Sequence, residues 1–292
     1  MRDRPEVALI PMSPPMEEPI VSVLMPVANG ERFLPEALKS LQAQTLQAWE
    51  LIAVLDGCTD RTEAILTEQR DQRIRVKTMP SRRGIAHALN RGLSCCRSDF
   101  VARFDADDVC LPTRLERQVA VLRERPSLGV LGSPARLIDE DSQPVGFRAV
   151  QRGARRLRLG LLFRNQFIHP SVMFRRSVVM QAGSYDERMG QVQDYELWLR
   201  VLRISQLDNV AEPLIAYRVY PGQSSSILRL ESGVFPSLAD SRRGAVESVG
   251  GPAFFARWLD TLWWSAQSRR RSGRFRRLLE AANNFTRQLF GG

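Results

Sequence analysis

Two aspartates separated by a single residue follow an apolar stretch in the middle of the chain. The run Asp105-Ala106-Asp107-Asp108 comes directly after Phe100–Phe104, which has the composition of a buried strand. In an extended chain, residues two apart point the same way, so Asp105 and Asp107 can face one pocket while Ala106 turns aside. Two such carboxylates repel each other unless a cation lies between them, and oxygen ligands suit Mg²⁺ or Mn²⁺ bound together with substrate phosphates. The spacing predicts a divalent-cation site; the alternative is an acidic turn in which Asp108 caps the next helix.

A second polar cluster, Asp56-Gly57-Cys58-Thr59-Asp60, follows the apolar run Leu51–Leu55. Gly57 allows the backbone to approach a ligand closely, and Asp56 can accept a hydrogen bond from the N–H of a nucleotide base. The alternative is a helix start that Thr59 or Asp60 caps.

A third candidate acid, Asp194, stands at the predicted start of a helix that contains Trp198. A carboxylate in that position can serve as a general base. It can equally stabilise the helix N-terminus, and from this segment alone that is the simpler interpretation.

The elements that must position these acids alternate between apolar strands and amphipathic helices. Continuous apolar strands of this kind predict an α/β fold with a mostly parallel sheet and helices on both faces. Ligands of such sheets bind beyond the carboxyl ends of the strands, where Ala28-Asn29, Asp56-Gly57 and Asp105–Asp108 all fall. The predicted strands are 21–27, 51–55, 74–77, 100–104, 128–131, 135–138 and 171–174, with extended chain at 210–219; the predicted helices are 33–41, 62–69, 85–93, 112–122, 152–163 and 195–202.

Charge is concentrated at the C-terminal end of the chain. From residue 227 onward there are eleven arginines and five acids, which supply +6 of the overall net charge of +10. This composition predicts a basic, amphipathic helical appendage that contacts either an anionic membrane or the catalytic domain itself. Zinc-finger, homeodomain and RNP-type patterns are absent from the sequence, so we expect no nucleic-acid partner.

The four cysteines have no C-x-x-C spacing, and no apolar run approaches the roughly 20 residues that a membrane span needs. We therefore expect a cytoplasmic protein, with peripheral contact at the inner face of the membrane as one option for the basic tail. The proline-rich segment 1–19 is interpreted as a loose leader.

Taken together, seven segments resemble glycosyltransferase family 2 in their order and spacing. They are VSVLMPVANGERFLPEALKSLQAQT, ELIAVLDGCTD, GIAHALNRGL, FVARFDADDVCLPTRLERQ, HPSVMFRRS, GSYDE and QDYELWLR, within about Pro19 to Ser226. The resemblance implies a GT-A fold over 20–226, with a nucleotide-binding part at about 20–127 and an acceptor part at about 128–226, followed by the appendage 227–292. It also implies an inverting transfer of sugar from a nucleotide diphosphate donor to a glycan or lipid-linked acceptor, as in bacterial polysaccharide synthesis, and UDP is the nucleotide we expect.

The resemblance assigns roles to individual residues. By position, Asp56 is similar to the acid that pairs with the nucleotide base, Asp105 to the acid near the ribose or the metal, and Asp107 to the ligand of Mn²⁺ or Mg²⁺. Asp194 matches the general base. The remaining residues that the resemblance places in the nucleotide-sugar pocket are Pro26, Ala28, Asn29, Arg83 and Gly84.

Two departures from the family pattern bear on activity. Relatives often have an aromatic residue where Ala28 stands, and many have a histidine where this chain has Tyr220. These departures motivate one alternative, a catalytically weakened membrane-surface protein of the same fold. A nucleotidyltransferase is the other alternative, although Val27–Glu31 lacks the glycine-rich, basic loop of those enzymes.

Overall fold

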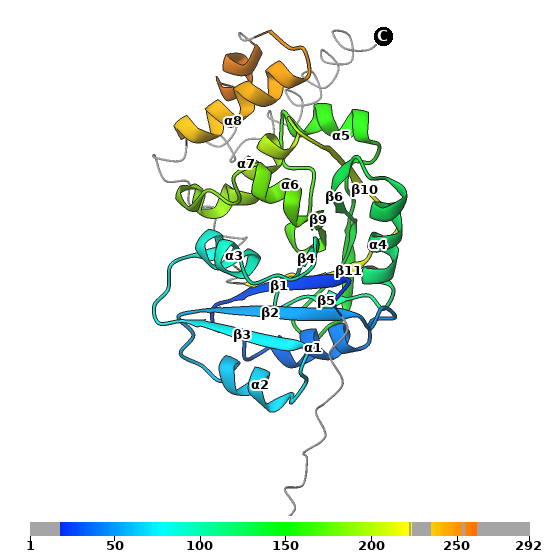
Figure 1. Cartoon of the computed structure of the whole chain (residues 1–292), viewed down its shortest axis with the longest axis vertical. Helices are drawn as coiled ribbons and strands as arrows, with labels where there is room; N and C mark the ends of the chain where they lie inside the picture. The colour runs from blue at the N-terminus through cyan, green and yellow to red at the C-terminus, as the bar shows by residue number, and fades with distance from the viewer. Residues whose placement is uncertain (1–17, 222, 224–234, 253–254, 262–292) are drawn as a thin grey trace, which may run out of the picture.

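The computed structural model describes residues 18–221, 223, 235–252 and 255–261, which form a mixed α/β fold around a seven-stranded sheet (Figure 1). Six of the strands are mutually parallel where they pair, and only β9 runs antiparallel to its neighbours. The mostly parallel sheet predicted from the apolar runs is therefore confirmed. In spatial order the strands are β10 (Gln206–Asn209), β6 (Leu128–Gly132), β9 (Met173–Arg175), β4 (Phe100–Arg103), β1 (Val21–Val27), β2 (Trp49–Asp56) and β3 (Ile74–Met79).

Both faces of this sheet are covered, which explains why the central strands have no polar face. In β1, Val23 and Met25 point into one apolar cluster and Leu24 points into the other. The first cluster is closed by α1 (Leu34–Gln42), α2 (Thr62–Glu68) and α4 (Arg114–Glu124). The second is closed by α3 (Ile85–Leu93), α5 (Ala154–Leu161), α6 (Arg176–Gln181), α7 (Gln193–Val201) and α8 (Phe235–Ser248).

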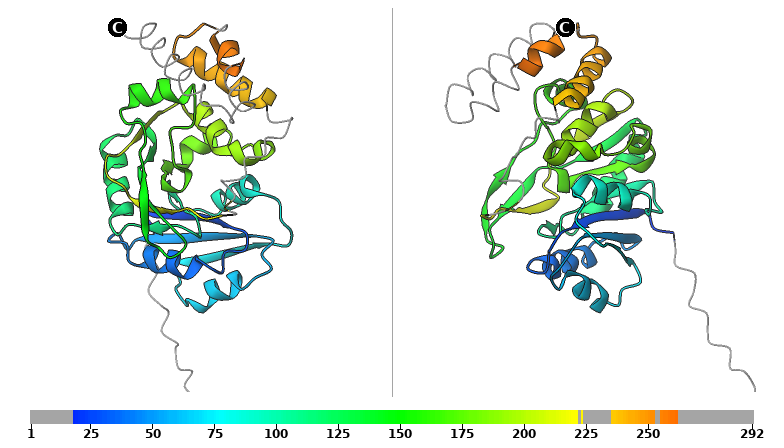
Figure 2. Two further views of the ribbon diagram at one scale, coloured as in Figure 1. Left: turned by 180° about the vertical axis from the view of Figure 1, so that it is seen from behind. Right: turned by 90° about the vertical axis from the view of Figure 1, so that its left-hand side faces the viewer.

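The helices are arranged on opposite sides of the sheet in space (Figures 1 and 2). The α1 and α2 helices lie beside β1–β3 on one side, whereas α3, α7 and α8 follow one another away from it on the other. Helix α8 packs on α7 and contributes Leu238, Ala245 and Val246 to the core. The beginning of the basic C-terminal region is thus part of the folded domain.

A second, four-stranded sheet brings the chain after residue 210 back to the acidic run. Its strands, in order, are β5 (Val109–Cys110), β11 (Ile215–Arg218), β7 (Ala135–Ile138) and β8 (Pro144–Arg148). Strand β5 begins immediately after Asp108 and pairs with β11, with Ala216 opposite Val109. Residues just beyond β11 are therefore held against the acidic run, 110 positions earlier in the chain.

Several boundaries differ from the sequence predictions. The strand predicted at 171–174 begins later, because the 3₁₀ turn η1 (His169–Ser171) precedes β9, and a second 3₁₀ segment, η2 (Glu187–Val192), leads into α7. Of the extended region predicted at 210–219, only Ile215–Arg218 is a strand, β11, and β10 precedes that region. Strand β8 and helices α6 and α8 were not predicted. All five residues of β8 are exposed, so this strand has no apolar alternation to reveal it.

Two amphipathic stripes are predicted in the tail, one from Phe255 to Ala266 and one from Phe275 to Leu289, and the structure describes part of the first. Residues 255–261 are helical, with Phe255 and Leu259 buried, in agreement with the first stripe. The end of that stripe, the whole second stripe from Phe275 to Leu289, and residues 1–17 lie outside the described residues. Among the helices that the structure describes, none combines the length and the apolar character needed to cross a bilayer.

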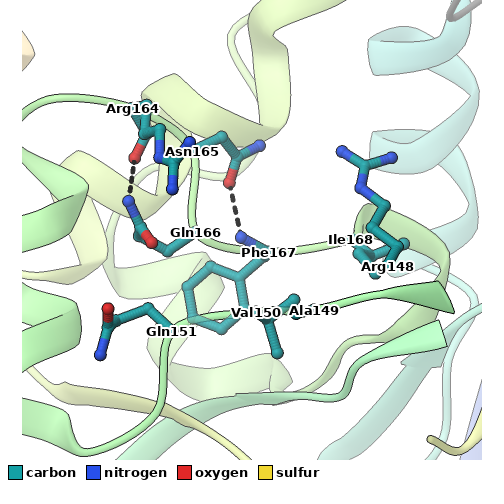
Figure 3. A pocket seen from close by; sticks show the side chains of 9 residues that line it. All are labelled: Arg148, Ala149, Val150, Gln151, Arg164, Asn165, Gln166, Phe167 and Ile168. Carbon is teal, nitrogen blue, oxygen red and sulfur yellow. Dashed lines mark hydrogen bonds between the residues drawn. The ribbon is translucent and has the colours of Figure 1, made fainter. Parts of the chain in front are cut away.

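The structure also contains a cavity of about 360 Å³ between two segments of the second half of the chain (Figure 3). One wall runs from the end of β8 at Arg148 to Gln151, and the other from Arg164 to Ile168. In the sequence, the first wall lies between β8 and helix α5, and the second wall lies between α5 and η1.

Candidate active site

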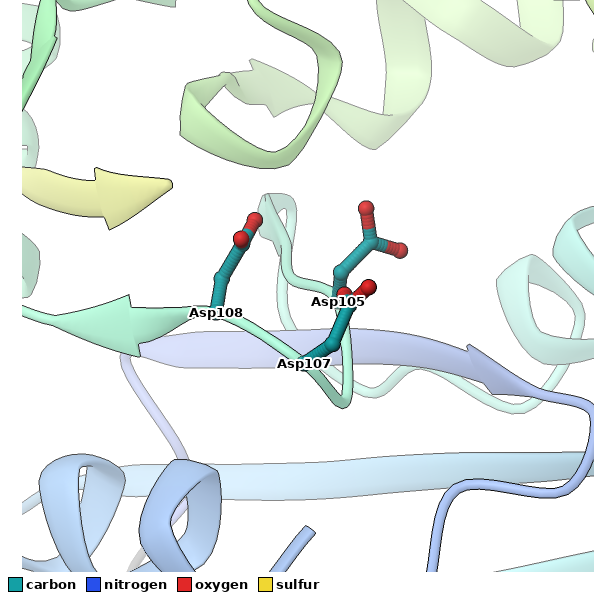
Figure 4. Close-up of side chains that lie close together, drawn as sticks. All are labelled: Asp105, Asp107 and Asp108. Carbon is teal, nitrogen blue, oxygen red and sulfur yellow. The ribbon is translucent and has the colours of Figure 1, made fainter. Parts of the chain in front are cut away.

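The acidic run forms a loop at the carboxyl end of β4, beside β1 at the centre of the sheet. Asp105, Asp107 and Asp108 each offer a carboxylate oxygen within 4.8 Å of the others, and the three side chains rise from the loop together (Figure 4). Ala106 turns away and is buried beside Gly30 of the β1–α1 loop. The shared orientation of Asp105 and Asp107 is what the spacing of the residues predicts.

The alternative role for Asp108, capping the next helix, is wrong. Helix α4 begins only at Arg114 and has Thr113 at its N-cap. Asp108 is instead 1% exposed, and its Oδ1 accepts a hydrogen bond of 2.9 Å from the backbone N–H of Arg218. Its other oxygen, Oδ2, is buried without a hydrogen-bond partner among the described residues.

Crowding of negative charge alters the ionisation of this cluster. Burial, followed by repulsion from Asp105, raises the pKa of Asp107 to about 6. Burial and the neighbouring charges of Asp107 and Asp105 raise the pKa of Asp108 well above its ordinary value. The cluster therefore binds protons more tightly than isolated aspartates do, and a bound cation would relieve the same repulsion.

Arg103, the last residue of β4, places a buried guanidinium next to the acids. The side chain is only 3% exposed and forms an ion pair with Asp105 Oδ2. Burial disfavours its charge, but the attraction of Asp105 outweighs burial and raises the pKa of Arg103. Arg103 thus remains a fixed positive charge at the edge of the cluster.

Tyr220 occupies the position where many family members have histidine, and it contacts the acidic run directly. Its hydroxyl donates a hydrogen bond of 3.0 Å to Asp107 Oδ2. The ring of Tyr220 lies against Phe33, with ring centroids 5.2 Å apart. The residue at this position therefore orients Asp107.

The buried side chain of Arg218 connects the segments that surround the acidic run. Its side chain is completely buried and donates to the Asp107 carbonyl oxygen at 2.8 Å, to the Asp139 carbonyl oxygen at 2.8 Å and to Glu36 Oε2 at 2.5 Å. One guanidinium therefore connects the acidic run, the turn after β7 and helix α1. Such a fully used buried arginine fixes the geometry of the cluster.

Asp194 lies in the first turn of α7, with Val192 at the N-cap, so it is not the capping residue. Its Oδ2 accepts a hydrogen bond of 2.6 Å from Asn165 Nδ2, and its Oδ1 accepts one of 2.7 Å from the backbone N–H of Tyr195. Burial raises the pKa of Asp194 despite these bonds. A carboxylate with a raised pKa is a stronger base than an exposed aspartate.

The charge of Arg103 connects Asp194 with the acidic cluster. It opposes the rise that burial causes in the pKa of Asp194, and it acts in the same direction on Asp107 and Asp108. Burial, followed by the same charge of Arg103, lowers the pKa of His169, whose Nε2 lies 3.0 Å from the hydroxyl of Tyr185. The predicted base and the predicted metal ligands therefore share one electrostatic environment.

The residues predicted to bind the nucleotide lie on the loops that follow β1, β2 and β3. Asp56 is buried, and its two oxygens accept the backbone N–H groups of Arg83 at 2.6 Å and Gly84 at 2.8 Å. Gly57 has a φ of +64°, and a Cβ there would lie 2.6 Å from the Arg82 nitrogen, so this close approach requires glycine. Asp56, Arg83 and Gly84 therefore lie together, with Asp56 fixing the turn, and the pairing of Asp56 with a nucleotide base stays a prediction.

The loop after β1 is tied to the loop after β2. Asn29 has a φ of 59°, and its Oδ1 accepts the Thr59 N–H at 2.8 Å. The N-cap of α2 is Arg61, without a side-chain cap bond, so the predicted capping by Thr59 or Asp60 is wrong. Asp60 instead accepts the Glu31 N–H at 3.0 Å and the Thr62 N–H at 3.1 Å. The other two residues of this predicted group, Pro26 and Ala28, are half-buried and exposed, respectively.

The sequence did not identify three contributors to this site, namely Arg103, Asn165 and Arg218. Arg103 had a usable signal, because it precedes Asp105 by two residues in extended chain and so shares its direction. Asn165 and Arg218 act through partners 29 and 182 positions away, respectively, for which no local pattern exists.

Comparison with known proteins gives a consistent family match. The family model "Glycosyl transferase family 2" matches residues 22–182. An uncharacterised glycosyltransferase of Haemophilus influenzae is 32% identical over 210 residues, which are 70% of this chain and 78% of that protein. The amylovoran biosynthesis glycosyltransferase AmsE of Erwinia amylovora is 31% identical over 208 residues, 68% of this chain and 75% of that protein.

Solved structures extend the likeness to the fold. The crystal structure of S. aureus TarS 1–349 in complex with UDP-GlcNAc superposes with a TM-score of 0.65 at 16% identity, covering 84% of this chain and 71% of that one. This likeness shows the fold, a large mostly parallel sheet flanked by helices, which is the GT-A arrangement expected from the sequence.

Proposed function

The chain belongs to glycosyltransferase family 2, and from that premise we propose that it transfers a sugar, with inversion, from a nucleotide diphosphate donor to an acceptor hydroxyl. The observation that carries the proposal is the convergence of Asp105, Asp107 and Asp108 at the end of β4, with Asp194 under the influence of the same Arg103 charge. A transfer of this type needs a charged centre for the departing diphosphate and a base for the acceptor.

The carboxylates fit a divalent cation. Three of their oxygens lie within 4.8 Å of one another, the pKa of Asp107 is raised to about 6, and Asp108 Oδ2 is buried without a hydrogen-bond partner among the described residues. Hard oxygen donors of this kind suit Mn²⁺ or Mg²⁺, which Asp107 and Asp105 would hold. When bound, such an ion neutralises charge on a diphosphate leaving group.

The protein's own residues supply the remaining functions. Asp194 accepts the proton that the acceptor hydroxyl loses as it attacks, and Asn165 keeps the carboxylate pointed in one direction. The turn that Asp56 fixes, together with Asn29, encloses the nucleotide. Attack from the side opposite to the leaving group inverts the configuration of the sugar in a single displacement.

The nature of the substrates is proposed from the relatives. TarS was crystallised with UDP-GlcNAc, which supports a UDP-sugar as donor. AmsE is named for amylovoran biosynthesis, which supports a role in making a cell-envelope polysaccharide or a lipid-linked glycan. Because Tyr220 retains a polar contact with Asp107, an intact site is favoured over a catalytically weakened protein.

Release of nucleoside diphosphate tests the proposal. Purified protein with Mn²⁺ is incubated with a panel of nucleotide sugars and candidate acceptors, and release of UDP is measured. We expect Asp107→Ala to abolish transfer and Asp194→Asn to reduce kcat by about 10²–10⁴-fold, since loss of a general base has that effect. Asp240→Asn, an exposed site on α8, is the matched control. Full activity in both site variants would contradict the assignment.

Contact between the basic tail and an anionic membrane is a separate proposal. Helix α8 belongs to the core, so the segment to remove is 262–292 rather than the whole region from 227. We expect the truncated chain to pellet less with anionic vesicles than the full chain. Equal pelleting would reject the idea.

A further inference from the structure

The cavity between the end of β8 and the loop before η1 has the properties of a binding site. Its volume of about 360 Å³ falls within the ~300–1,000 Å³ typical of small-molecule sites. Its two walls run from Arg148 to Gln151 and from Arg164 to Ile168 (Figure 3). A monosaccharide is the size of ligand that such a space suits.

The two walls of the cavity are fixed to each other by a residue at the end of β10. Asn209 Nδ2 donates to the Gln151 carbonyl oxygen at 2.8 Å and to the Gln166 carbonyl oxygen at 3.2 Å, one on each wall. The ring of Phe167 packs on Trp198 of α7, with centroids 5.6 Å apart. The two walls of the cavity are therefore held together by hydrogen bonds, and one of them packs on α7, the helix that carries the proposed base.

One lining residue connects the cavity directly to the proposed base. Asn165 donates through Nδ2 to Asp194 Oδ2 at 2.6 Å and accepts the Phe167 N–H on Oδ1 at 3.0 Å. The carboxylate of Asp194 is thus hydrogen-bonded to a residue of the cavity wall. A sugar held in the cavity would therefore lie against a residue that is bonded to the base.

The charge of the lining favours an anion. Arg148 and Arg164 both line the cavity, and none of the described lining residues is acidic. The guanidinium of Arg148 lies 5.8 Å from the centroid of the Tyr217 ring. The guanidinium group of neither arginine forms a hydrogen bond or an ion pair with a described residue, although the backbone of Arg164 bonds to Gly160 and Gln166. Guanidinium groups bind carboxylate and phosphate through charge-assisted hydrogen bonds, so these two are available to an oxyanion.

We propose that this cavity is the acceptor subsite and that it takes a sugar carrying an oxyanion, either a carboxylate or a phosphate, which Arg148 and Arg164 recognise. The inference rests on the proposed function, because it places the acceptor hydroxyl next to Asp194. It adds to that function the charge class of the acceptor, which the residues of the donor site do not specify.

Binding of simple sugars to the metal-free protein tests the cavity without requiring turnover. Glucuronic acid, glucose 6-phosphate and glucose are titrated by calorimetry in EDTA. We expect at least one anionic sugar to bind about tenfold or more tightly than glucose, and Arg148→Gln and Arg164→Gln each to lose about tenfold of that affinity, as expected for a charge-assisted hydrogen bond. Arg123→Gln, an exposed arginine on α4, is the control for loss of one positive charge.

The pattern of binding distinguishes the two sources of the oxyanion. Preference for glucuronic acid indicates a uronic acid acceptor, and preference for glucose 6-phosphate indicates a phosphorylated one. Equal or absent binding of all three sugars, or anionic binding that survives both substitutions, would overturn the proposal.

Failure of the cavity assignment can be separated from failure of the proposed function. Release of UDP from a nucleotide sugar depends on Asp107 and Asp194, and it is measured in a separate assay. Turnover without selectivity for anionic sugars would reject the cavity alone. Selective binding in a protein that turns over no donor would reject the transferase proposal alone.

Discussion

Removal of one hydroxyl group at the acidic cluster should make metal binding depend more steeply on pH. Tyr220→Phe deletes the hydrogen bond of 3.0 Å to Asp107 Oδ2 but keeps the ring that packs on Phe33. The substitution therefore leaves the local packing intact. Its effect should be confined to the ionisation of Asp107.

The size of the effect follows from the pKa of Asp107, which is about 6. A hydrogen bond to a charged group contributes about 1.5 kcal/mol or more, and about 1.4 kcal/mol corresponds to one pKa unit, so its loss should raise this pKa by about 1. A cation binds only the ionised form. Affinity for Mn²⁺ should then fall by about tenfold at pH 5 and about fivefold at pH 6, while at pH 8 it should be almost unchanged.

Calorimetric titration of Mn²⁺ at pH 5, 6 and 8 measures this difference. Tyr195→Phe is the matched control, because its hydroxyl donates to the Leu161 carbonyl oxygen at 2.9 Å instead. An equal loss of affinity at all three pH values would mean that Tyr220 acts on the bound metal rather than on the proton. No loss at any pH would refute the hydrogen bond itself.

Three further predictions concern stability, measured by chemical denaturation of the metal-free protein. The raised pKa of Asp107 means that the folded state binds the proton of this residue more tightly than the unfolded state does. The resulting contribution to the free energy of unfolding is fully present below about pH 4 and is lost as the pH rises through about 6. Relative to Asp107→Asn, the free energy of unfolding of the wild type should fall by up to about 3 kcal/mol between pH 4 and 7. Gly57→Ala should cost about 1–3 kcal/mol, because it combines a left-handed φ with a clash against the Arg82 nitrogen. Arg218→Met should cost about 3–5 kcal/mol, because it leaves Glu36 and the neighbouring carbonyl groups without their buried partner.

Each of these predictions has a control within the chain. Parallel pH profiles of the wild type and Asp107→Asn would contradict the first. Gly153→Ala also has a positive φ, of +87°, but its Cβ would meet no atom within 4 Å, so an equal cost at both glycines would show that the clash is unimportant. Arg123→Met removes an exposed arginine and should cost less than about 0.5 kcal/mol.

The sequence was sufficient to predict the central architecture. Strands β1, β2 and β4 are continuous apolar runs because both of their faces are covered, and polar residues stand where each strand ends. Since the carboxyl ends of parallel neighbours meet at one edge of the sheet, the placement of Asp56 and Asp105 along that edge followed from local patterns alone.

The supporting contacts could not be predicted in the same way. The pairing of Arg218 with Glu36 and that of Asn165 with Asp194 join residues far apart in the chain, and their residue types and local spacing carry no signal of the pairing. Strand β8 could not be predicted either, because a fully exposed strand shows no alternation between apolar and polar residues. These contacts depend on how the second sheet and helix α7 close over the first sheet.

The central claim is that the carboxylates at the end of β4 bind a divalent cation together with the diphosphate of the donor. Titration of UDP with and without Mn²⁺, in the wild type and in Asp107→Ala, tests it most directly. The account predicts that Mn²⁺ tightens UDP binding by about tenfold or more in the wild type and by much less in the variant. Equal affinity for UDP with and without Mn²⁺ in the wild type would contradict it.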